Sequence, residues 1–193
     1  KTNTQNSGKD TKEYSMNIFY LSDDPQLCAE QHCDKHVVKM CIEYAQLLST
    51  AHRVLDGEEY TVIQHGRRIK RWRLDFDFMD KNLMLASHIN HPSNIWAREN
   101  HRNYRWLFML LKFLLKEYTH RYGKTHAVER RLDYLNLFPT NIKIKPTGTP
   151  MPQCMPDDCK VEHMPILAYQ NFYMKHKRPF CNWTKRPRPI WFT

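Results

Sequence analysis

The chain has 193 residues with a formal net charge of +10, and 41% of its residues are hydrophobic. This length allows one domain with a substantial core and leaves little room for a second, and the composition is that of a folded protein. Only five glycines occur, which argues against a β-sandwich or barrel with many tight turns. The basic balance favours a polyanionic partner: DNA, RNA or an anionic membrane surface.

Neither a secretory signal nor a membrane span is expected. Residues 1–15 are polar, and the longest apolar stretch, Trp106–Leu115, is interrupted by Lys112 and is far shorter than the roughly 20 residues that a spanning helix needs. The six cysteines do not form the dense framework of a small secreted domain. We therefore expect reduced thiols, a cytoplasmic location (the host cytoplasm if the protein is viral), and nucleic acid, not membrane, as the polyanion.

The first half of the chain predicts one long helix and a hairpin. Residues 1–15 have the composition of a flexible N-terminal tail, and the fold is expected to begin at Met16 with a short extended segment. Pro25 suits the first turn of a helix that runs to about Arg53 and stops near Gly57. Residues 60–64 and 67–74, joined by His65-Gly66, predict a β-hairpin with a two-residue turn. Residues 75–90 fit either a short helix or an ordered loop.

The second half predicts a central helix and a long loop. A helix is expected from Pro92 to about Tyr122, ended by Gly123, and its second half is apolar nearly all round, as in a buried core helix. A third helix should cover roughly 126–137, and a proline-rich loop follows over 139–165. A fourth helix should open at Pro165 and run to about 177.

Together these elements predict a mainly α fold. A single helical domain, residues 16–177, should contain two long core helices and one small β-hairpin. Residues 178–193 are rich in proline, tryptophan and basic residues, and should form an extended C-terminal tail. We expect Trp183, Trp191 and Phe192 of that tail to dock on the body of the protein.

The helix predicted over 25–53 has an unusual polar face. Its members lie three and four residues apart: His32, His36, Lys39, Glu43 and Gln46. The opposite face is apolar and carries Val37, Val38, Cys41, Ala45 and Leu48. A carboxylate four residues after a lysine is the minimum for activating an amine or moving a proton. The alternative is an ordinary solvated helix face with a surface Lys39–Glu43 pair.

Cysteine and histidine occur in two loose sets. They are Cys28, Cys33, His32 and His36, and, further on, Cys154, Cys159 and His163. A ligand eight residues along a helix lies about 12 Å away, too far to share an ion, and neither set has a standard zinc spacing. We therefore expect no bound metal and no cofactor, with a structural zinc as a minor alternative.

Two segments suggest contacts with nucleic acid. Residues 88–98 are dense in polar groups and lead into a helix N-terminus, where free N–H groups bind phosphate. The candidate phosphate or base contacts there are His91, Arg98, Asn103 and Tyr104, and the alternative is a helix cap with a buried arginine network. The second hairpin strand carries five basic residues: Arg67, Arg68, Lys70, Arg71 and Arg73.

Basic groups neutralise phosphates, and aromatic side chains stack on exposed bases. An exposed basic strand has a shape that can follow a groove. Trp72 lies within this strand, and further basic sets near 175–178 and 185–188 alternate with Phe180 and Trp183. We therefore expect DNA as partner, with duplex favoured, and the N- and C-terminal tails as contacts for a possible protein partner.

From Met16 onward the chain resembles a family of small proteins found in bacteriophage and bacterial genomes. The stretches that carry this resemblance are 16–19, 33–40, Glu43, 45–49, 91–92, 96–98, 103–107, 117–118, 121–124 and 155–157. More remotely, the chain is similar to the pyrimidine-dimer DNA glycosylases of the phage endonuclease V type, which are small, basic and helical. That family's first helix carries an Asp-x-His step and a catalytic glutamate seven residues after the histidine, which match Asp34, His36 and Glu43.

The resemblance implies a glycosylase and lyase mechanism. An amine attacks the sugar C1′ and expels the base, a Schiff base forms, and β-elimination nicks the strand, while the glutamate stabilises the sugar cation. In that family the amine is the chain's own N-terminus, and the matching position here is near Asn17, but fifteen residues precede Met16. Either that tail is removed or foreign to the natural start, or a lysine such as Lys39 substitutes, or this chemistry is absent. The family's basic residues beside the glutamate are missing, and Ile42 and Gln46 stand there.

We therefore expect a DNA-processing enzyme, a DNA glycosylase/AP-lyase-like repair protein of viral or bacterial origin. Glu43 would supply electrostatic and acid–base function, Lys39 or an amine near Asn17 the nucleophile, and His36 and Arg98 would position phosphate or base. One alternative is a phage DNA- or nucleotide-modifying enzyme that depends on a small-molecule donor. The other is a non-enzymatic protein that binds nucleic acid or is associated with a virion.

Overall fold

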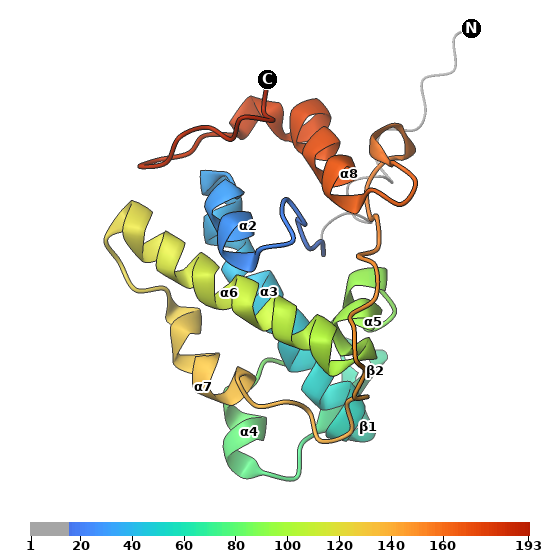
Figure 1. Cartoon of the computed structure of the whole chain (residues 1–193). Coiled ribbons are helices and arrows are strands. Elements are labelled where there is room, and N and C mark those ends of the chain that lie inside the picture. The colour runs from blue at the N-terminus through green and yellow to red at the C-terminus, as the bar shows by residue number, and fades with distance from the viewer. Residues whose placement is uncertain (1–15) are drawn as a thin grey trace, which may run out of the picture.

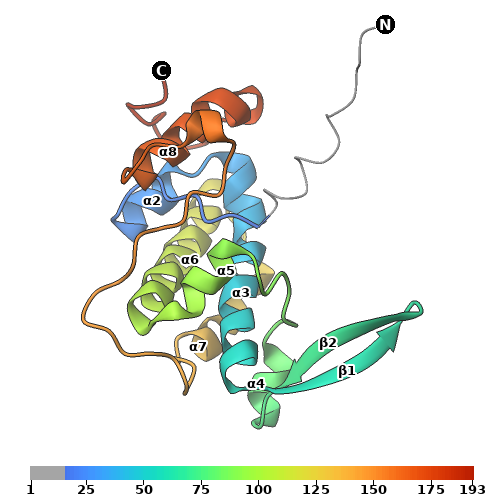
Figure 2. The same ribbon diagram turned by 90° about the vertical axis from the view of Figure 1, so that its right-hand side faces the viewer.

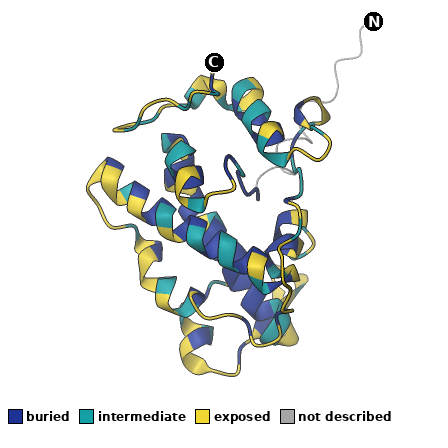
Figure 3. Ribbon diagram, viewed as in Figure 1, coloured by how far each residue is buried: buried dark blue, intermediate teal, exposed yellow. Residues whose placement is uncertain are grey.

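Two long helices form the centre of the molecule. The computed structural model describes residues 16–193, and the N-terminal tail predicted over 1–15 lies outside them. The fold is mainly α-helical with one small antiparallel hairpin, as predicted. Helices α3 (Asp34–Asp56) and α6 (His101–Tyr122) cross and pack on each other (Figure 1). Where they cross, both are largely buried (Figure 3).

The helix predicted over 25–53 is in fact two helices, so the prediction of one continuous helix is wrong. Helix α2 (Pro25–Gln31) begins at an Asp24 cap and ends at His32, whose backbone is extended with φ −61° and ψ 132°. The buried His32 ring contacts Cys28 O at 2.7 Å through Nδ1 and the Tyr44 hydroxyl at 2.7 Å through Nε2. These contacts hold the side chain at the junction, and α3 starts in a new direction at Asp34.

The helix predicted over 92–122 is also broken. Helix α5 (Pro92–Glu99) ends at Asn100, which has φ −157° and ψ 164°. The Asn100 side chain accepts hydrogen bonds from Arg102 N and Asn103 N and so caps the start of α6. The predicted stop at Gly123 is confirmed, and this residue has φ +65°, a conformation that glycine adopts without strain.

The hairpin follows directly from the end of α3. Strands β1 (Glu58–Gln64) and β2 (Arg67–Arg73) pair antiparallel, with a turn at His65 and Gly66 that both have positive φ, so this prediction is confirmed. Gly57 lies between α3 and β1. A Cβ atom at this position would lie 2.5 Å from Arg53 O, so a larger residue would force the backbone to shift. Figure 2 shows the hairpin projecting away from the helices.

Buried Arg53 fixes the base of the hairpin. Its Nη1 donates to Trp72 O at 2.8 Å and to Asp80 Oδ1 at 2.7 Å, and its other nitrogens bind Asp80 O, Leu83 O and Met84 O. The hairpin is therefore held to α3 and to α4 (Asp77–Asn82), the short helix in the region that the sequence left open.

The remaining elements surround this core. A 3₁₀ turn (Ala127–Arg131) and the short α7 (Leu132–Leu135) occupy the region predicted as a third helix. Helix α8 (Pro165–Phe172) continues as a π-helical turn to Lys177, close to the predicted helix. In residues 178–193, Trp183 Nε1 donates to Gln31 O at 2.8 Å, and Phe192 is buried. In the part of the chain described, no helix combines the length and apolar character needed to cross a membrane.

Candidate functional site

Lys39 and Glu43 form an ion pair on α3, with Nζ 3.2 Å from Oε1. The Lys39 side chain is 55% exposed, whereas that of Glu43 is only 13% exposed. Oε2 of Glu43 is buried and has no hydrogen-bond partner among residues 16–193. Burial raises the pKa of the Glu43 carboxyl, and the Lys39 ammonium lowers it in part. The pair therefore combines an accessible amine with a carboxyl that can hold a proton above its ordinary pH range.

Of the other residues in the predicted polar stripe, Gln46 is half-buried, and the two histidines are buried. His36 is 5% exposed; its Nδ1 lies 2.6 Å from the Tyr173 hydroxyl, and its ring stacks on Phe19. Burial lowers its pKa, so the ring is neutral near pH 7. His32 is fully buried, while Val38 of the expected apolar face is 43% exposed. The assignment of the two faces is therefore wrong at these positions, and we leave His36 out of the site.

Asn17 is an interior residue. It is 1% exposed, its Oδ1 accepts a hydrogen bond from the Tyr169 hydroxyl at 2.9 Å, and its Nδ2 donates to Cys154 O. In this chain its backbone nitrogen belongs to a peptide bond and is not a free amine. As it stands, the Asn17 side chain ties the first residues of the fold to α8 and to the long loop before it.

The structure adds Lys177 to the candidate amines. Its ammonium lies 4.5 Å above the Phe172 ring, and its pKa is lowered by burial and by the nearby charges of Lys39 and Lys35. A lysine with a lowered pKa has more of the neutral, nucleophilic form. The sequence placed Lys177 only within a basic set, because nothing local shows that the end of α8 returns to α3.

Two residues predicted to contact phosphate or base lie in α5 or at its start. Arg98 remains a candidate, whereas His91 caps the helix. Nη2 of Arg98 donates to Ile89 O at 2.7 Å, while its buried Nη1 has no hydrogen-bond partner among the described residues. Burial lowers the pKa of Arg98. The His91 side chain accepts a hydrogen bond from Ser93 N and so occupies the helix N-terminus that was expected to bind phosphate.

Asn103 and Tyr104 belong to the core. Asn103 is 1% exposed and donates to Trp96 O and Thr149 Oγ1, at 2.9 and 2.7 Å. Tyr104 is 0% exposed and donates to Leu135 O at 2.8 Å. Both side chains are fully engaged inside the protein, so we leave them out of the nucleic-acid interface.

The hairpin presents its basic residues to solvent, all five being exposed or half-buried. The register pairs Tyr60 with Arg71 and Gln64 with Arg67, so these residues and Arg73 share one face of the ribbon. The Arg73 guanidinium lies 5.1 Å from the centre of the Tyr60 ring. On the other face, Nζ of Lys70 lies 2.9 Å from Oε1 of Glu59, and Arg68 is exposed.

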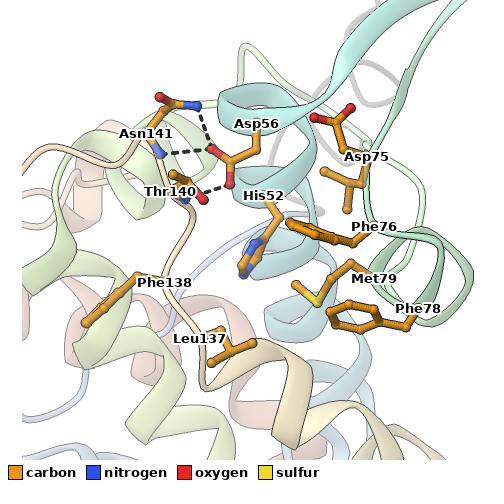
Figure 4. Close-up of a pocket in the computed structure, with 11 residues that line it drawn as sticks. His52, Asp56, Asp75, Phe76, Phe78, Met79, Leu137, Phe138, Thr140 and Asn141 are labelled. Atoms are coloured by element: carbon orange, nitrogen blue, oxygen red, sulfur yellow. Dashed lines mark hydrogen bonds between the residues drawn. The ribbon is translucent and has the colours of Figure 1, made fainter.

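A pocket of about 370 Å³ lies at the base of the hairpin, next to the end of β2 (Figure 4). Two of its polar side chains are engaged: Asp56 accepts hydrogen bonds from Thr140 N and Asn141 N, and His52 Nε2 contacts the Tyr104 hydroxyl, while the exposed Asp75 also lines the pocket. Burial lowers the pKa of His52 to about 4, so it is neutral near pH 7.

What this pocket offers is therefore aromatic surface. Phe76 and Phe78 are 65% and 51% exposed, and Phe138 lines the opposite side (Figure 4). Such rings can stack on a planar group, and Asp75 adds an exposed carboxylate, but no lysine lines the pocket among the described residues, so it lacks the amine that Lys39 supplies beside Glu43.

Comparison of the chain with protein-family models, with curated proteins and with solved structures finds no match.

Proposed function

We propose that this protein is a cytoplasmic DNA-processing enzyme of the glycosylase/AP-lyase type, in which Lys39 is the amine and Glu43 the acid. The observation that carries the proposal is the Lys39–Glu43 pair, with its 3.2 Å contact and the unpartnered, buried Oε2 of Glu43. A lyase needs an amine that can reach a sugar carbon and a carboxyl that stabilises a developing cation and moves protons.

The states of the two groups suit these roles. Glu43 is largely buried, and this burial raises its pKa, which favours the protonated form that an acid needs. Lys39 is exposed enough to meet an aldehydic sugar, and the Glu43 carboxylate 3.2 Å away can accept an amine proton. Lys177, with its lowered pKa, is the second amine that the experiment must separate from Lys39.

DNA would be held by the projecting hairpin. A two-stranded ribbon fits the major groove of a duplex, and the arginines of β2 can neutralise phosphates. Glu43 lies 13 residues before the end of α3, which at the helical rise is about 20 Å from the hairpin base. A duplex of ordinary length covers that span. Phe76 and Phe78 beside the hairpin would stack on an unpaired base.

The test is borohydride trapping on abasic and on ultraviolet-irradiated duplex DNA, with chains that begin at Lys1 and at Asn17. We expect a covalent protein–DNA adduct from the Lys1 chain that is lost in Lys39→Met and retained in Lys177→Met. Lys35→Met, which removes an equal charge one helical turn away, is the matched control. Glu43→Gln should bind DNA normally and fail to nick it.

Other outcomes select other functions. An adduct only with the Asn17 chain would transfer the chemistry to the N-terminal amine, and loss in Lys177→Met would transfer it to Lys177. No adduct from either chain, together with salt-sensitive DNA binding, would refute the lyase proposal. The exposed hairpin would then favour a non-enzymatic nucleic-acid-binding protein or an enzyme that modifies DNA with a small-molecule donor.

A further inference from the structure

Three metal-ligating side chains meet where the long loop packs against the end of α8. Asp158 and Cys159 lie in a 3₁₀ turn (Asp157–Cys159), and His176 lies in the π-helical turn that follows α8. Their ligand atoms are all within 4.8 Å of one another. The sequence grouped Cys159 with Cys154 and His163, but the His163 side chain is 90% exposed, and its Nε2 lies 3.3 Å from Oε1 of the adjacent Glu162.

Two of the three distances within the cluster match those between the ligands of one zinc ion, and the third, from His176 to Cys159, is within 4.8 Å. Nε2 of His176 is 3.3 Å from Oδ1 of Asp158, and Sγ of Cys159 is 3.6 Å from the same oxygen. A tetrahedral zinc ion bound at about 2.0 Å by oxygen and nitrogen and about 2.3 Å by sulfur holds its ligands about 3.3 to 3.6 Å apart. The side chains therefore need little movement to close on an ion.

The surroundings also suit a cation with an open position. Cys159 is buried, and Asp158 and His176 are half-exposed, with side-chain exposures of 54% and 40%, so an ion can enter from the surface. Nζ of Lys175 lies 3.6 Å from Oδ2 of Asp158 and also donates to Asp158 O, which leaves Oδ1 for the ion. Asn171 Nδ2 donates to Cys159 O at 3.3 Å and holds the turn that carries the thiol.

We propose that Asp158, Cys159 and His176 bind a Zn²⁺ ion, with water as the fourth ligand. On binding, the Cys159 thiol releases its proton to solvent and becomes the thiolate ligand. The ion joins the loop turn at 157–159 to the turn after α8, two segments that are otherwise connected by side-chain contacts at the surface. The three proposed ligands include neither Lys39 nor Glu43, so the proposal does not depend on the lyase function.

The test is a titration of the full reduced chain with Co²⁺, followed by displacement with Zn²⁺. We expect one ion per chain, an intense near-ultraviolet band from thiolate-to-cobalt charge transfer, and visible bands typical of a tetrahedral site. Zn²⁺ should raise the melting temperature. His176→Gln and Asp158→Asn change half-exposed residues and should fold normally, and each should weaken binding by at least about tenfold.

Matched controls separate this site from other thiols and histidines. His163→Gln and Cys154→Ser should leave the titration unchanged, while Cys159→Ser should remove the charge-transfer band. Circular dichroism of each variant verifies that it is folded. The proposal is overturned if the wild-type chain shows no thiolate band, or if the band persists in Cys159→Ser or is lost in His163→Gln.

Discussion

The carboxylate of Glu117 on α6 binds the guanidinium group of Arg186, with Nη2 2.9 Å from Oε2 and Nε 3.0 Å from Oε1. Glu117 also accepts a hydrogen bond from Nε of Arg121, one helical turn later, at 2.7 Å. Arg121 is fully buried, and its Nη1 lies 2.9 Å from Oδ1 of Asp34 at the start of α3. This chain of charges therefore joins α6, α3 and the C-terminal segment.

Removing the charge of Glu117 should destabilise the fold strongly. Its side chain is 3% exposed, and Glu117→Gln removes the carboxylate that binds both Arg121 and Arg186, which leaves the buried Arg121 with Asp34 as its remaining carboxylate partner, so we expect the free energy of unfolding to fall by about 3–5 kcal/mol. Arg186→Ala removes a partner that is 30% exposed and should cost about 1.5–3 kcal/mol. Urea denaturation measures both. Arg188→Ala, in the same segment, should change stability by less than about 0.5 kcal/mol, and an equal effect of Arg186→Ala and Arg188→Ala would contradict this interpretation.

The same carboxylate should make the fold sensitive to acid. Burial raises the pKa of Glu117, but the guanidinium groups of Arg186 and Arg121 outweigh it and hold the pKa below its ordinary value. A group with a depressed pKa in the folded state stabilises the fold above its unfolded pKa of about 4.3, and this contribution is lost as pH falls through the folded pKa. Urea midpoints between about pH 7 and pH 3 should fall less steeply in Glu117→Gln than in the wild type. Parallel curves would exclude Glu117 as a source of the acid sensitivity.

The features of the fold that were predicted correctly depend on local signals. Pro25 opens a helix, Gly123 ends one, and His65-Gly66 turns the hairpin, and in each case the residue's own backbone preference decides. The two helix breaks have non-local or side-chain causes. His32 is held by Tyr44, twelve residues later, and Asn100 caps a new helix inside a pattern that reads as continuous. The spacing of apolar residues along the chain predicts neither the His32–Tyr44 contact nor the Asn100 cap.

The candidate site was predictable in the same limited sense. The Lys39–Glu43 spacing is visible in the sequence, but the burial of one Glu43 oxygen depends on packing from other elements. His36 was misassigned because α3 is covered on more than one side, and Phe19 and Tyr173 enclose its ring. Lys177 and His176 become candidates only because the turn after α8 brings Lys177 near Lys39 and His176 near Asp158 and Cys159, which the sequence does not show.

The pH dependence of nicking in Lys39→Met should show whether Lys39 is the nucleophile or only tunes Glu43. The Lys39 ammonium lowers the pKa of Glu43 against the larger, opposite effect of burial. If an N-terminal amine or Lys177 performs the attack, Lys39→Met leaves activity and moves the pKa of Glu43 upward, so the carboxyl stays protonated to higher pH. If Lys39 is the nucleophile, Lys39→Met abolishes the adduct at every pH. Nicking rates on abasic duplex from about pH 5 to pH 9 distinguish the two cases. An unchanged profile in Lys39→Met would show that Glu43 takes no part.

The hairpin arginines should control the salt dependence of DNA binding. Arg67 and Arg71 share the exposed face of the ribbon, and each phosphate contact that is lost should reduce the slope of log K against log salt by about 0.9 on duplex DNA. Arg67→Ala/Arg71→Ala should therefore reduce the slope by up to about 2, without change in stability. The double variant Lys112→Ala/Arg130→Ala removes the same charge from exposed positions outside the hairpin and should leave the slope nearly unchanged. Equal effects of the two double variants would mean that net charge alone governs binding.

Mild oxidation should link Cys33 to Cys181. The interaction with the Cys181 thiol lowers the pKa of Cys33, and the adjacent backbones are joined because Asp34 N donates to Asn182 O at 2.8 Å. Cys33 is fully buried, whereas Cys181 is half-buried, so an oxidant reaches the pair through Cys181. A diazene oxidant such as diamide takes two hydrogens from the thiols and becomes the hydrazine, leaving one intramolecular disulfide.

Peptide mapping should place that disulfide between Cys33 and Cys181, and the oxidised protein should gain about 2–4 kcal/mol because the C-terminal segment can no longer separate from α3 in the unfolded state. Cys181→Ser should abolish the crosslink, and Cys154→Ser should retain it. A crosslink that joins other cysteines, or none with diamide in excess, would contradict the packing of residues 178–193 against the start of α3.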